Sequence, residues 1–573
     1  MNQKIKSIQN FLTKNEYDFY LVTNSDIHLN ESPNLFQKDI YNLTGFDCSN
    51  GYLLIFDKKT IFFTDSRYTL AAEKFFKKKI GVINLKERSI SNYLMILDKH
   101  LKGLVDPKLI SINEINNLSK ELNKSNIKII PFTKNLYKKN YFPDFETSYP
   151  FSLPKYCIPR AYEDNIKWIR SRLNSDGILI WNNAHIAYLL NIRSFEIHNS
   201  TKPFAGLFIS KKLSKPIIIS NNKFLLNIEK IKNNFQIMTQ SKFISNIFSK
   251  KLILLELQYN YSNFDIYRSL SKNIKIINTK IDIDKKISQK TTKEIKNIKI
   301  CHKEDGLSLT RFILQLNKNK SFTNEYSIAS DLYQLRKEGI NFFCNSFDYI
   351  SALDQNAAIV HYKPTKIKSE KLSDQSILLI DSGAHYLEGT TDVTRVLKLN
   401  TLKFKEIKKY YTYLLKSLIM IENTSFINGI TGSDLDNFLR NYLLKFNISY
   451  GHGTGHAVGY FNDVHEKYPL LGPNSKHKIL NNNLFSIEPG FYLKNKFGLR
   501  IENLYFSKVH HNKIQLINTT LVPYDISLID WNLILPREKK FIKSYHKRIF
   551  DEFRYRFSDD ERKKYKKTLI DKI

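Results

Sequence analysis

Two segments of the chain each combine the pattern of a β-hairpin with a symmetric pair of acidic residues. Residues 376–399 read as strand, turn and strand, with Gly383 and Gly389 between the two apolar runs. Asp381 and Asp392 lie near equal distances from the centre of this segment. In an antiparallel hairpin their side chains would face each other, and two bare carboxylates that close repel. A bound cation would relieve the repulsion, although a solvated hairpin with two incidental aspartates fits the same pattern.

Residues 486–503 repeat this arrangement. Glu488 and Glu502 lie at equal distances from a turn near Asn495. Glu488 follows the apolar run from Leu484 to Ile487, where an unpaired carboxylate would carry a large desolvation cost. Pairing, protonation or metal ligation would each remove this cost and are favoured, while bare surface glutamates remain an alternative.

A glycine-rich segment, residues 451–466, supplies three histidines: His452, His456 and His465. Glycines at these positions would let the backbone approach a ligand closely. One imidazole combined with four carboxylates makes an oxygen-rich site, which suits manganese, iron or cobalt better than structural zinc. Each histidine taken singly is also compatible with a core or surface position.

The length of the chain, 573 residues, is too great for one hydrophobic core, so we expect several domains. Short β-rich runs alternate with helical segments near the N-terminus and again after residue 163, which is typical of α/β layers. Prolines interrupt regular structure and predict a linker at Pro143, Pro150, Pro154 and Pro159. The predicted domains are residues 1–160, 161–286, 287–510 and a C-terminal extension of residues 511–573.

Individual elements follow from the same patterns. Thr291 and Thr292 mark a helix start, since apolar residues then recur near a 3.6-residue period. Pro536 opens another helix, and the tail after this helix is too charged to form core. A further helix is expected at Tyr68–Lys79. The apolar stripe of the Pro536 helix is Phe541, Tyr545, Ile549 and Phe553, and the expected strands are Phe19–Thr23, Gly51–Phe56, Thr60–Thr64, Gly177–Trp181, Pro216–Ile219 and Leu252–Leu255.

The formal net charge of +34 would ordinarily suggest a nucleic-acid or anionic-membrane partner. Lysine is scattered along the whole chain, so neither partner is expected here. Cys48, Cys157, Cys301 and Cys344 lie far apart without a CxxC pair, which favours a reducing compartment over a disulfide framework. Because no segment has the apolar length of a signal sequence or a membrane span, we expect a cytoplasmic protein.

The ordered motifs of the chain resemble aminopeptidase P of the methionine-aminopeptidase and creatinase superfamily, in its long three-domain cytosolic branch. The resemblance implies an α/β plus α+β architecture: two creatinase-like N-terminal α/β domains, then a pita-bread catalytic domain. It also implies a homodimer built partly through the C-terminal extension. The segments that carry it are FFTDSRYTLAAEKF (62–75), AYLLNIRSFEI (187–197), NAAIVHY (356–362), DSGAHYLEGTTDVTR (381–395), GHGTGHAVG (451–459), VHE (464–466), IEPGFY (487–492) and LRIEN (499–503).

Site residues carried over from this resemblance comprise a ligand set and a substrate-binding set. The ligands implied for two divalent ions, manganese by expectation, are Asp381, Asp392, His456, Glu488 and Glu502, with Asp392 and Glu502 bridging. Glu488 is implied to act as general base and then general acid. The other catalytic or substrate-binding residues implied are His361, His452, His465, Arg500 and Tyr492; His361 and His465 would contact the scissile peptide, and Arg500 would hold carboxylates in place.

The activity that the resemblance implies is release of the first residue from peptides with proline in second position. A prolidase-like dipeptidase shares all five ligands and stays an alternative, as does a non-catalytic binding protein on the same fold. The sequence departs from the family pattern at Tyr460, Asn462, Asp463 and Lys467–Tyr468. None of these is an expected ligand, so we expect the departures to alter the substrate pocket.

Overall fold

The computed structural model describes residues 3–97, 100–137, 148–249, 251–316, 323–372 and 375–573. These residues form two compact units. The first contains residues 1–154 and 160–282, and the second contains residues 155–159 and 283–573. Of the predicted linker prolines, Pro143 lies outside the described residues, and Pro159 belongs to the short segment that packs with the second unit.

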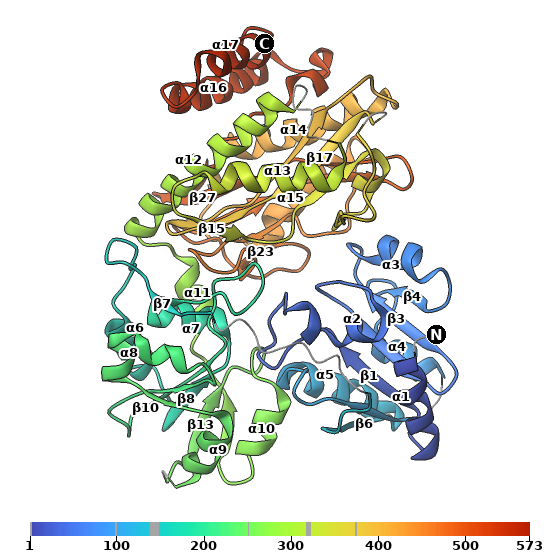
Figure 1. Ribbon diagram of the computed structural model, residues 1–573, viewed down its shortest axis with the longest axis vertical. Helices are drawn as coiled ribbons and strands as arrows, with labels where there is room; N and C mark the ends of the chain where they lie inside the picture. Colours follow the sequence, from blue (N-terminus) through green and yellow to red (C-terminus); the bar gives the residue numbers. More distant parts are fainter. Residues whose placement is uncertain (1–2, 98–99, 138–147, 250, 317–322, 373–374) are drawn as a thin grey trace. The chain divides into compact units, whose positions relative to one another are not determined.

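The first unit contains two six-stranded mixed sheets with the same topology (Figure 1). In each sheet a central strand pairs antiparallel with one neighbour and parallel with the other. The first sheet has the order β4 (Gly81–Asn84), β3 (Thr60–Thr64), β2 (Tyr52–Phe56), β1 (Phe19–Thr23), β5 (Lys102–Val105), β6 (Lys128–Pro131). The second has the order β12 (Gln236–Met238), β11 (Ile217–Ile219), β10 (Gly206–Ser210), β8 (Gly177–Ile180), β13 (Leu254–Leu257), β14 (Lys275–Asn278).

Strand β1 shows why these sheets are covered on both faces. All five of its residues are buried, and successive side chains of a strand point to opposite faces. Phe19 and Leu21 join one hydrophobic cluster, while Tyr20 and Val22 join another. The helices that cover the two sheets are α1 (Gln3–Lys14), α2 (Asp39–Thr44), α3 (Thr69–Phe76), α4 (Ile90–Leu97), α5 (Ile112–Leu122), α6 (Tyr162–Arg170), α7 (Asn183–Leu190), α8 (Glu229–Asn234), α9 (Gln240–Phe248) and α10 (Phe264–Leu270).

The second unit consists of antiparallel sheets with long helices lying over them (Figure 1). Its helices are α11 (Ile283–Ser288), α12 (Thr292–Gln315), α13 (Glu325–Lys337), α14 (Glu406–Glu422), α15 (Gly432–Leu444), α16 (Pro536–Phe553) and α17 (Asp559–Leu569). Its largest sheet has the order β21 (Phe426–Ile427), β28 (Lys513–Asn518), β27 (Asn503–His510), β24 (Leu484–Ile487), β22 (Gly455–Ala457), β23 (Glu466–Leu471). The smaller sheets are β16 (Ile350–Leu353) with β17 (Ile377–Ser382) and β20 (Val393–Lys398); β15 (Phe342–Asn345) with β18 (Ala384–Tyr386) and β19 (Gly389–Thr390); and β25 (Gly490–Leu493) with β26 (Phe497–Arg500).

Most predicted element starts are confirmed. Thr291 is the N-cap of α12, and its side chain and that of Glu294 form a reciprocal capping box. Helix α16 begins at Pro536 as predicted. The prediction that the tail beyond this helix contributes no core was wrong, because α17 buries Tyr565 and Leu569 in the main hydrophobic cluster of the unit.

The second predicted hairpin has the expected register. Gly490 pairs with Arg500 across β25 and β26, and Ile487 pairs with Asn503 across β24 and β27. Asn495, at the turn, has a positive φ of 62°, which asparagine tolerates better than most residues. The two ladders therefore share one centre and form one two-stranded ribbon. The pairing is interrupted between the two ladders, where Glu488 and Glu502 lie.

The interruption arises because the backbone at this level bonds to other strands. Pro489 has no N–H to donate to the ladder. The N–H of Glu488 donates to the carbonyl of Thr454 (2.8 Å), and the N–H of Glu502 donates to the carbonyl of Thr394 (3.2 Å). Glu502 thus lies beside β20, and Glu488 lies beside the residue just before β22. We call this place, where the ribbon bonds to both neighbours, the ribbon crossing.

The first predicted hairpin forms about the expected centre, but its two aspartates are not directly opposite each other. Asp381 pairs with Thr394, not with Asp392, which comes just before β20. Strands β18 and β19 occupy the segment expected to be a simple turn; they pair with each other, and β18 also pairs with β15. Gly383 permits this, because a Cβ there would lie 2.0 Å from the carbonyl oxygen of Thr391. The offset is two residues, and a period of two keeps Asp392 on the same face as Thr394 and Asp381.

The C-terminal helices are tied to this ribbon by one buried arginine. Arg395 on β20 is fully buried, and its guanidinium donates to the backbone carbonyls of Glu502 (2.7 Å) and Val522 (2.8 Å). It also donates to the hydroxyl of Tyr545 on α16 (3.2 Å). Its partners are neutral oxygens, so its contribution comes from hydrogen bonds that bring three segments together.

We expect Arg395→Met to lower the free energy of unfolding by about 3 kcal/mol or more, because buried carbonyl acceptors lose a charged donor. Urea denaturation measures this loss. Exposed Arg548 on α16 also donates to backbone carbonyls, those of Asn518 and Thr520, and provides the control. Arg548→Met should cost less than about 1 kcal/mol; equal losses for the two variants would contradict the proposed role of Arg395.

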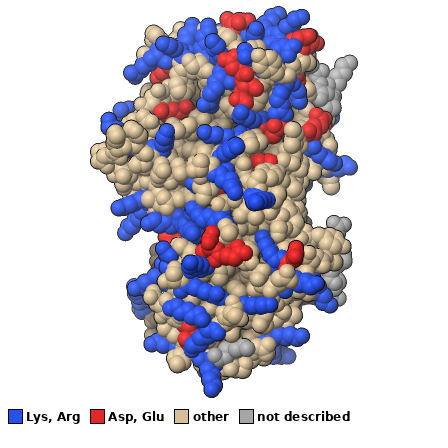
Figure 2. Space-filling model, turned by 90° about the vertical axis from the view of Figure 1, so that its left-hand side faces the viewer, with Lys and Arg blue, Asp and Glu red and all other residues tan. Residues whose placement is uncertain are grey.

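Two bulk predictions concern the surface and the cysteines. Lysine and arginine are spread over the face shown in Figure 2, with acidic side chains between them, and do not gather in one patch. The four cysteines are free thiols. Among the described residues, no helix has the length and apolar character needed to cross a membrane.

Candidate metal centre

Six side chains from four parts of the second unit bring their donor atoms together. The donors fall into three overlapping sets, and within each set all atoms lie within 4.8 Å of one another. The sets are Asp381, Asp392 and Glu502; His456, Glu488 and Glu502; and Asp392, His456 and His465. All five predicted ligands are therefore among the residues that the fold brings together, and Asp392, His456 and Glu502 each belong to two sets.

The ribbon crossing explains how distant residues converge. Asp381 lies at the end of β17 and Asp392 just before β20, while Glu488 and Glu502 lie at the interruption of the β24–β27 ribbon. His456 on β22 is adjacent, since β22 pairs with β24. Its Nε2 lies 3.5 Å from both an Asp392 oxygen and a Glu488 oxygen.

Unpartnered carboxylate oxygens test whether these residues fit a cation. Asp381 Oδ1, Asp392 Oδ1 and Glu502 Oε1 are buried and accept no hydrogen bond from the described residues. Buried polar atoms are nearly always partnered, so three orphaned oxygens in one cluster indicate a missing positive partner. The donor set of carboxylates and imidazole is the kind that holds hard or borderline divalent cations. The site therefore fits a metal.

The electrostatics of the cation-free cluster point the same way. Burial raises the pKa of Asp392 and of Glu502 well above their usual ranges, and the neighbouring carboxylates add to both shifts. Burial also raises the pKa of Glu488 to about 7, with the charge of Asp381 contributing and that of Arg500 opposing. Without a cation, the cluster would hold protons near neutral pH to limit its own repulsion.

Arg500 is the fixed cation of the site. Its guanidinium lies 2.6 Å from Asp381 Oδ2 and donates to the hydroxyl of Tyr492 at 2.8 Å. That hydroxyl lies 2.9 Å from Nε2 of His452, whose Nδ1 lies 2.8 Å from the carbonyl of Gly453. Since a carbonyl only accepts, Nδ1 carries the proton, and Nε2 accepts from the Tyr492 hydroxyl. A chain of hydrogen bonds thus joins His452 to Asp381.

Comparison with known proteins gives a family for this centre. Residues 296–507 match metallopeptidase family M24, and residues 514–568 match the C-terminal region of peptidase M24. Residues 4–138 match the creatinase/prolidase N-terminal domain. The chain therefore carries a metallopeptidase M24 domain behind a creatinase/prolidase N-terminal domain. The predicted family and fold class are confirmed, and the second sheet of the first unit has the topology of the creatinase-type sheet before it.

Relatives of similar length share this organisation. A probable Xaa-Pro aminopeptidase P of Pyrenophora teres f. teres (strain 0-1) is 27% identical over 97% of this chain and 90% of its own length. One from Paracoccidioides brasiliensis (strain Pb03) is 28% identical over 98% and 97%. The crystal structure of X-prolyl aminopeptidase from Caenorhabditis elegans, described as a cytosolic enzyme with a di-nuclear active site, has a TM-score of 0.89 and 25% identity and covers 99% of both chains. Xaa-Pro dipeptidase from Bacillus anthracis shares the fold over 63% of this chain (98% of its own), with 21% identity and a TM-score of 0.52.

The remaining predicted residues of the M24 domain fall in two places. His465 was expected only to contact substrate, but one of its ring nitrogens lies among the donors of Asp392 and His456. The rings of His465 and His456 pack edge to face with centroids 4.1 Å apart. His361 lies outside the three donor sets, three residues after the short helix η4 (Asp354–Ala358). Helix η4 packs against β26, where a Cβ on Gly498 would lie 1.8 Å from the carbonyl oxygen of Ala357.

Two hydroxyl residues of the M24 domain were missed from the sequence. Thr394 donates to Glu502 Oε2 at 2.8 Å and accepts from the guanidinium of Arg500 at 3.2 Å. Ser486 donates to Glu488 Oε1 at 3.2 Å and accepts from the N–H of His456 at 3.1 Å. Each lies two residues from a predicted ligand along a strand, so the period of two was the available signal.

Proposed function

We propose that this protein is a metal-dependent Xaa-Pro aminopeptidase that releases the N-terminal residue from peptides with proline in second position. The observation that carries the proposal is the convergence of five carboxylate and imidazole residues at one ribbon crossing, in a chain that aligns along its whole length with an X-prolyl aminopeptidase. The relatives that align with nearly the whole chain are named Xaa-Pro or X-prolyl aminopeptidases, which favours the aminopeptidase over the dipeptidase alternative.

Two divalent cations, which we take to be manganese, would be held by Asp381, Asp392, His456, Glu488 and Glu502, with Asp392 and Glu502 shared between them. When bound, such a pair supplies hydroxide near neutral pH and polarises the scissile carbonyl. Asp392 and Glu502 would suit the shared position because each belongs to two of the donor sets and, unlike His456, which also belongs to two, has two carboxylate oxygens to offer.

Glu488 has the role of moving the proton. It takes a proton at a carboxylate oxygen from the attacking water and delivers it to the leaving proline nitrogen. Ser486 fixes the orientation of that carboxylate through its hydrogen bond to Oε1. Because Glu488 is only partly buried, unlike Glu502, it is the carboxylate of the cluster with access to a substrate.

The other residues orient ligands or substrate. Arg500 holds Asp381 by its 2.6 Å ion pair and leaves Asp381 Oδ1 for the cation. The Tyr492 hydroxyl fixes the ring of His452, which we assign to the substrate pocket together with Tyr492. We assign His361 and His465 to contacts with the scissile peptide, where an imidazole N–H stabilises charge on the carbonyl oxygen.

A peptide-release assay tests the proposed activity. Purified protein with manganese should release alanine from an Ala-Pro-Phe tripeptide at least about tenfold faster than from an Ala-Pro dipeptide, since one extra substrate contact gives about this discrimination. Preference for the dipeptide would favour a prolidase. No release from either peptide, with no manganese bound, would favour a non-catalytic binding protein.

The cellular setting completes the proposal. We propose a cytoplasmic location, which the cytosolic C. elegans enzyme and the free thiols support. We also propose a homodimer, which light scattering on the purified protein would test. On the face shown in Figure 2, the basic charge is dispersed and does not form a focused surface for nucleic acid.

A further inference from the structure

A buried ion pair adjoins the candidate metal centre without belonging to it. Lys290 Nζ lies 2.8 Å from Glu466 Oε2, and the two side chains are 1% and 5% exposed. Glu466 directly follows His465, one of the clustered donors. A buried ion pair adds little net stability compared with well-packed apolar side chains. Stability alone is therefore a weak reason for this pair to lie here.

The backbone around His465 is held by few ladder bonds. Ala457 on β22 pairs with Glu466 on β23, but the next pair is His456 with Leu470. Residues 467–469 are therefore not paired with β22. At the end of β23 next to His465, there is one regular pair, Glu466 with Ala457. A bulge of this kind disrupts the ladder locally and re-aims side chains.

The loop before His465 is anchored at its other end. Asn462 exchanges two hydrogen bonds with the hydroxyl of Thr390: its N–H donates at 3.2 Å and its carbonyl accepts at 3.1 Å. Asn297 on α12 donates to the hydroxyl of buried Tyr460 at 2.7 Å. Two of the residues that depart from the family pattern thus bind the loop to the fold. At the end of the loop nearest His465, the carbonyl of Asp463 accepts from the N–H of Gly459 at 2.9 Å, and Glu466 pairs with Lys290.

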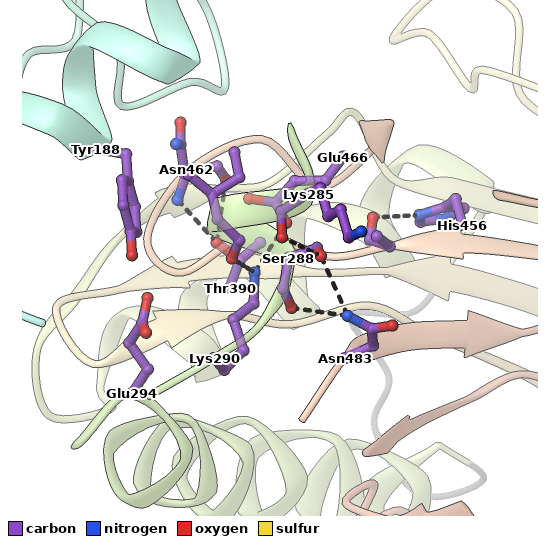
Figure 3. A network of polar contacts seen from close by, with 12 residues as sticks. Tyr188, Lys285, Ser288, Lys290, Glu294, Thr390, His456, Asn462, Glu466 and Asn483 are labelled. Carbon is purple, nitrogen blue, oxygen red and sulfur yellow. Dashed lines mark hydrogen bonds and ion pairs between the residues drawn. The ribbon is translucent and has the colours of Figure 1, made fainter. Parts of the chain in front are cut away.

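Lys290 is a rigid anchor for Glu466. Its N–H donates to the carbonyl of Asn482 at 2.9 Å, and its Nζ also donates to the carbonyl of Ile287 at 3.1 Å. The side chain of Asn483 donates to the carbonyl of Ser288 at 3.1 Å, so the segment between α11 and α12 is fastened beside the β24 strand (Figure 3). His465 lies at a bend directly before β23, and its ring belongs to the donor cluster, while the side chain of Glu466 pairs with Lys290. Because the two residues are adjacent, holding Glu466 also holds the backbone that carries His465.

We infer that the Lys290–Glu466 pair positions His465 for the hydrolysis proposed above. Because Glu466 pairs with Ala457 across β22 and β23, the ion pair also positions the adjacent His456. The inference rests on that proposed function for its catalytic consequence, whereas its effect on metal affinity does not require any activity. Neither residue touches substrate or the reacting atoms.

A double-variant experiment separates positioning from simple stability. Lys290→Met alone leaves a buried unpaired carboxylate and should lower both the melting temperature and kcat. Lys290→Met with Glu466→Met removes both charges and should restore the melting temperature. In the double variant kcat on Ala-Pro-Phe should stay about 10- to 100-fold below wild type with KM nearly unchanged, because small misplacements of a catalytic group cost this much. If kcat returns with the melting temperature, the pair is only structural and the inference is overturned.

A second buried pair in the same unit supplies the matched control. Lys416 on α14 lies 2.7 Å from Glu538 on α16 and also donates to the carbonyl of Leu533 at 2.6 Å. Lys416→Met with Glu538→Met should leave kcat within about twofold of wild type, since this pair touches no site residue. A loss of kcat equal to that of the Lys290 double variant would overturn the inference.

Metal affinity gives a readout that is independent of turnover. Calorimetric titration of manganese into chelator-treated protein should show affinity about tenfold weaker in the Lys290 and Glu466 double variant than in wild type, as for residues that orient metal ligands. If wild type binds manganese but cleaves no Xaa-Pro peptide, the proposed function fails while this test still decides the positioning role. Unchanged affinity in the double variant would contradict that role.

Discussion

Replacing Glu488 with glutamine should lower kcat on Ala-Pro-Phe by about 10³-fold or more, because the change removes a general base and a charged metal ligand together. Glutamine keeps the shape of the side chain, and the N–H of residue 488 can still donate to the carbonyl of Thr454. The fold should therefore survive, with an unchanged circular dichroism spectrum. Steady-state kinetics at saturating manganese measures the loss.

Glu422 on α14 is the control for this substitution. It is a glutamate of the same unit whose pKa is also raised by burial, and it accepts hydrogen bonds from Tyr505 and Asn518, both at 2.8 Å. Glu422→Gln should change kcat by less than about threefold, since it lies outside the donor cluster. A Glu488→Gln enzyme that retains wild-type turnover would remove Glu488 from the mechanism.

Stripping the metal should make the stability of the protein fall as pH rises. The pKa of Glu488 is raised from 4.5 to about 7, and those of Asp392 and Glu502 are raised well above their usual values. In the metal-free protein these groups bind protons that the unfolded chain has lost above about pH 5. Their stabilising contribution is complete below the unfolded pKa and is lost as pH rises through the folded pKa. For Glu488 alone the loss is about 3 kcal/mol.

Melting temperatures at pH 5 and pH 8 measure this effect. Chelator-treated protein should melt lower at pH 8 than at pH 5, and the gain in melting temperature on adding manganese should be larger at pH 8. The difference between metal-free and metal-loaded protein isolates the cluster, because other buried groups contribute equally to both. A gain in melting temperature on adding manganese that is no larger at pH 8 than at pH 5 would show that the carboxylates do not share protons as inferred.

Local sequence was sufficient for features set by local chemistry. The register of the second ribbon was predictable because Glu488 and Glu502 are equidistant from Asn495, and the observed pairs keep that centre. The start of α12 was predictable because Thr291 and Glu294 form a capping box within four residues. The ligand set was carried by the family resemblance and agrees with the donors that the fold brings together.

The first ribbon shows where this kind of inference fails. The sequence between Asp381 and Asp392 reads as a turn, but it forms β18 and β19, which pair with each other, and β18 also pairs with β15 from about 40 residues earlier in the chain. The local pattern gives no sign of this distant partner. His465 was similarly assigned to substrate alone, because no local signal says that its loop folds back onto His456.

The sequence by itself determined the strand and helix patterns, because periodicity, capping and turn residues act over a few positions, and the family resemblance of its motifs pointed to the metal ligands that lie on them. Only the tertiary structure decided how these parts are held together. Lys290 pairs with Glu466, 176 residues away, and Arg395 donates hydrogen bonds to distant backbone carbonyls. Neither interaction produces a periodic pattern in the sequence. The physical reason is that burial, which makes unpaired charges and carbonyls costly, is a property of the packed molecule and not of any segment.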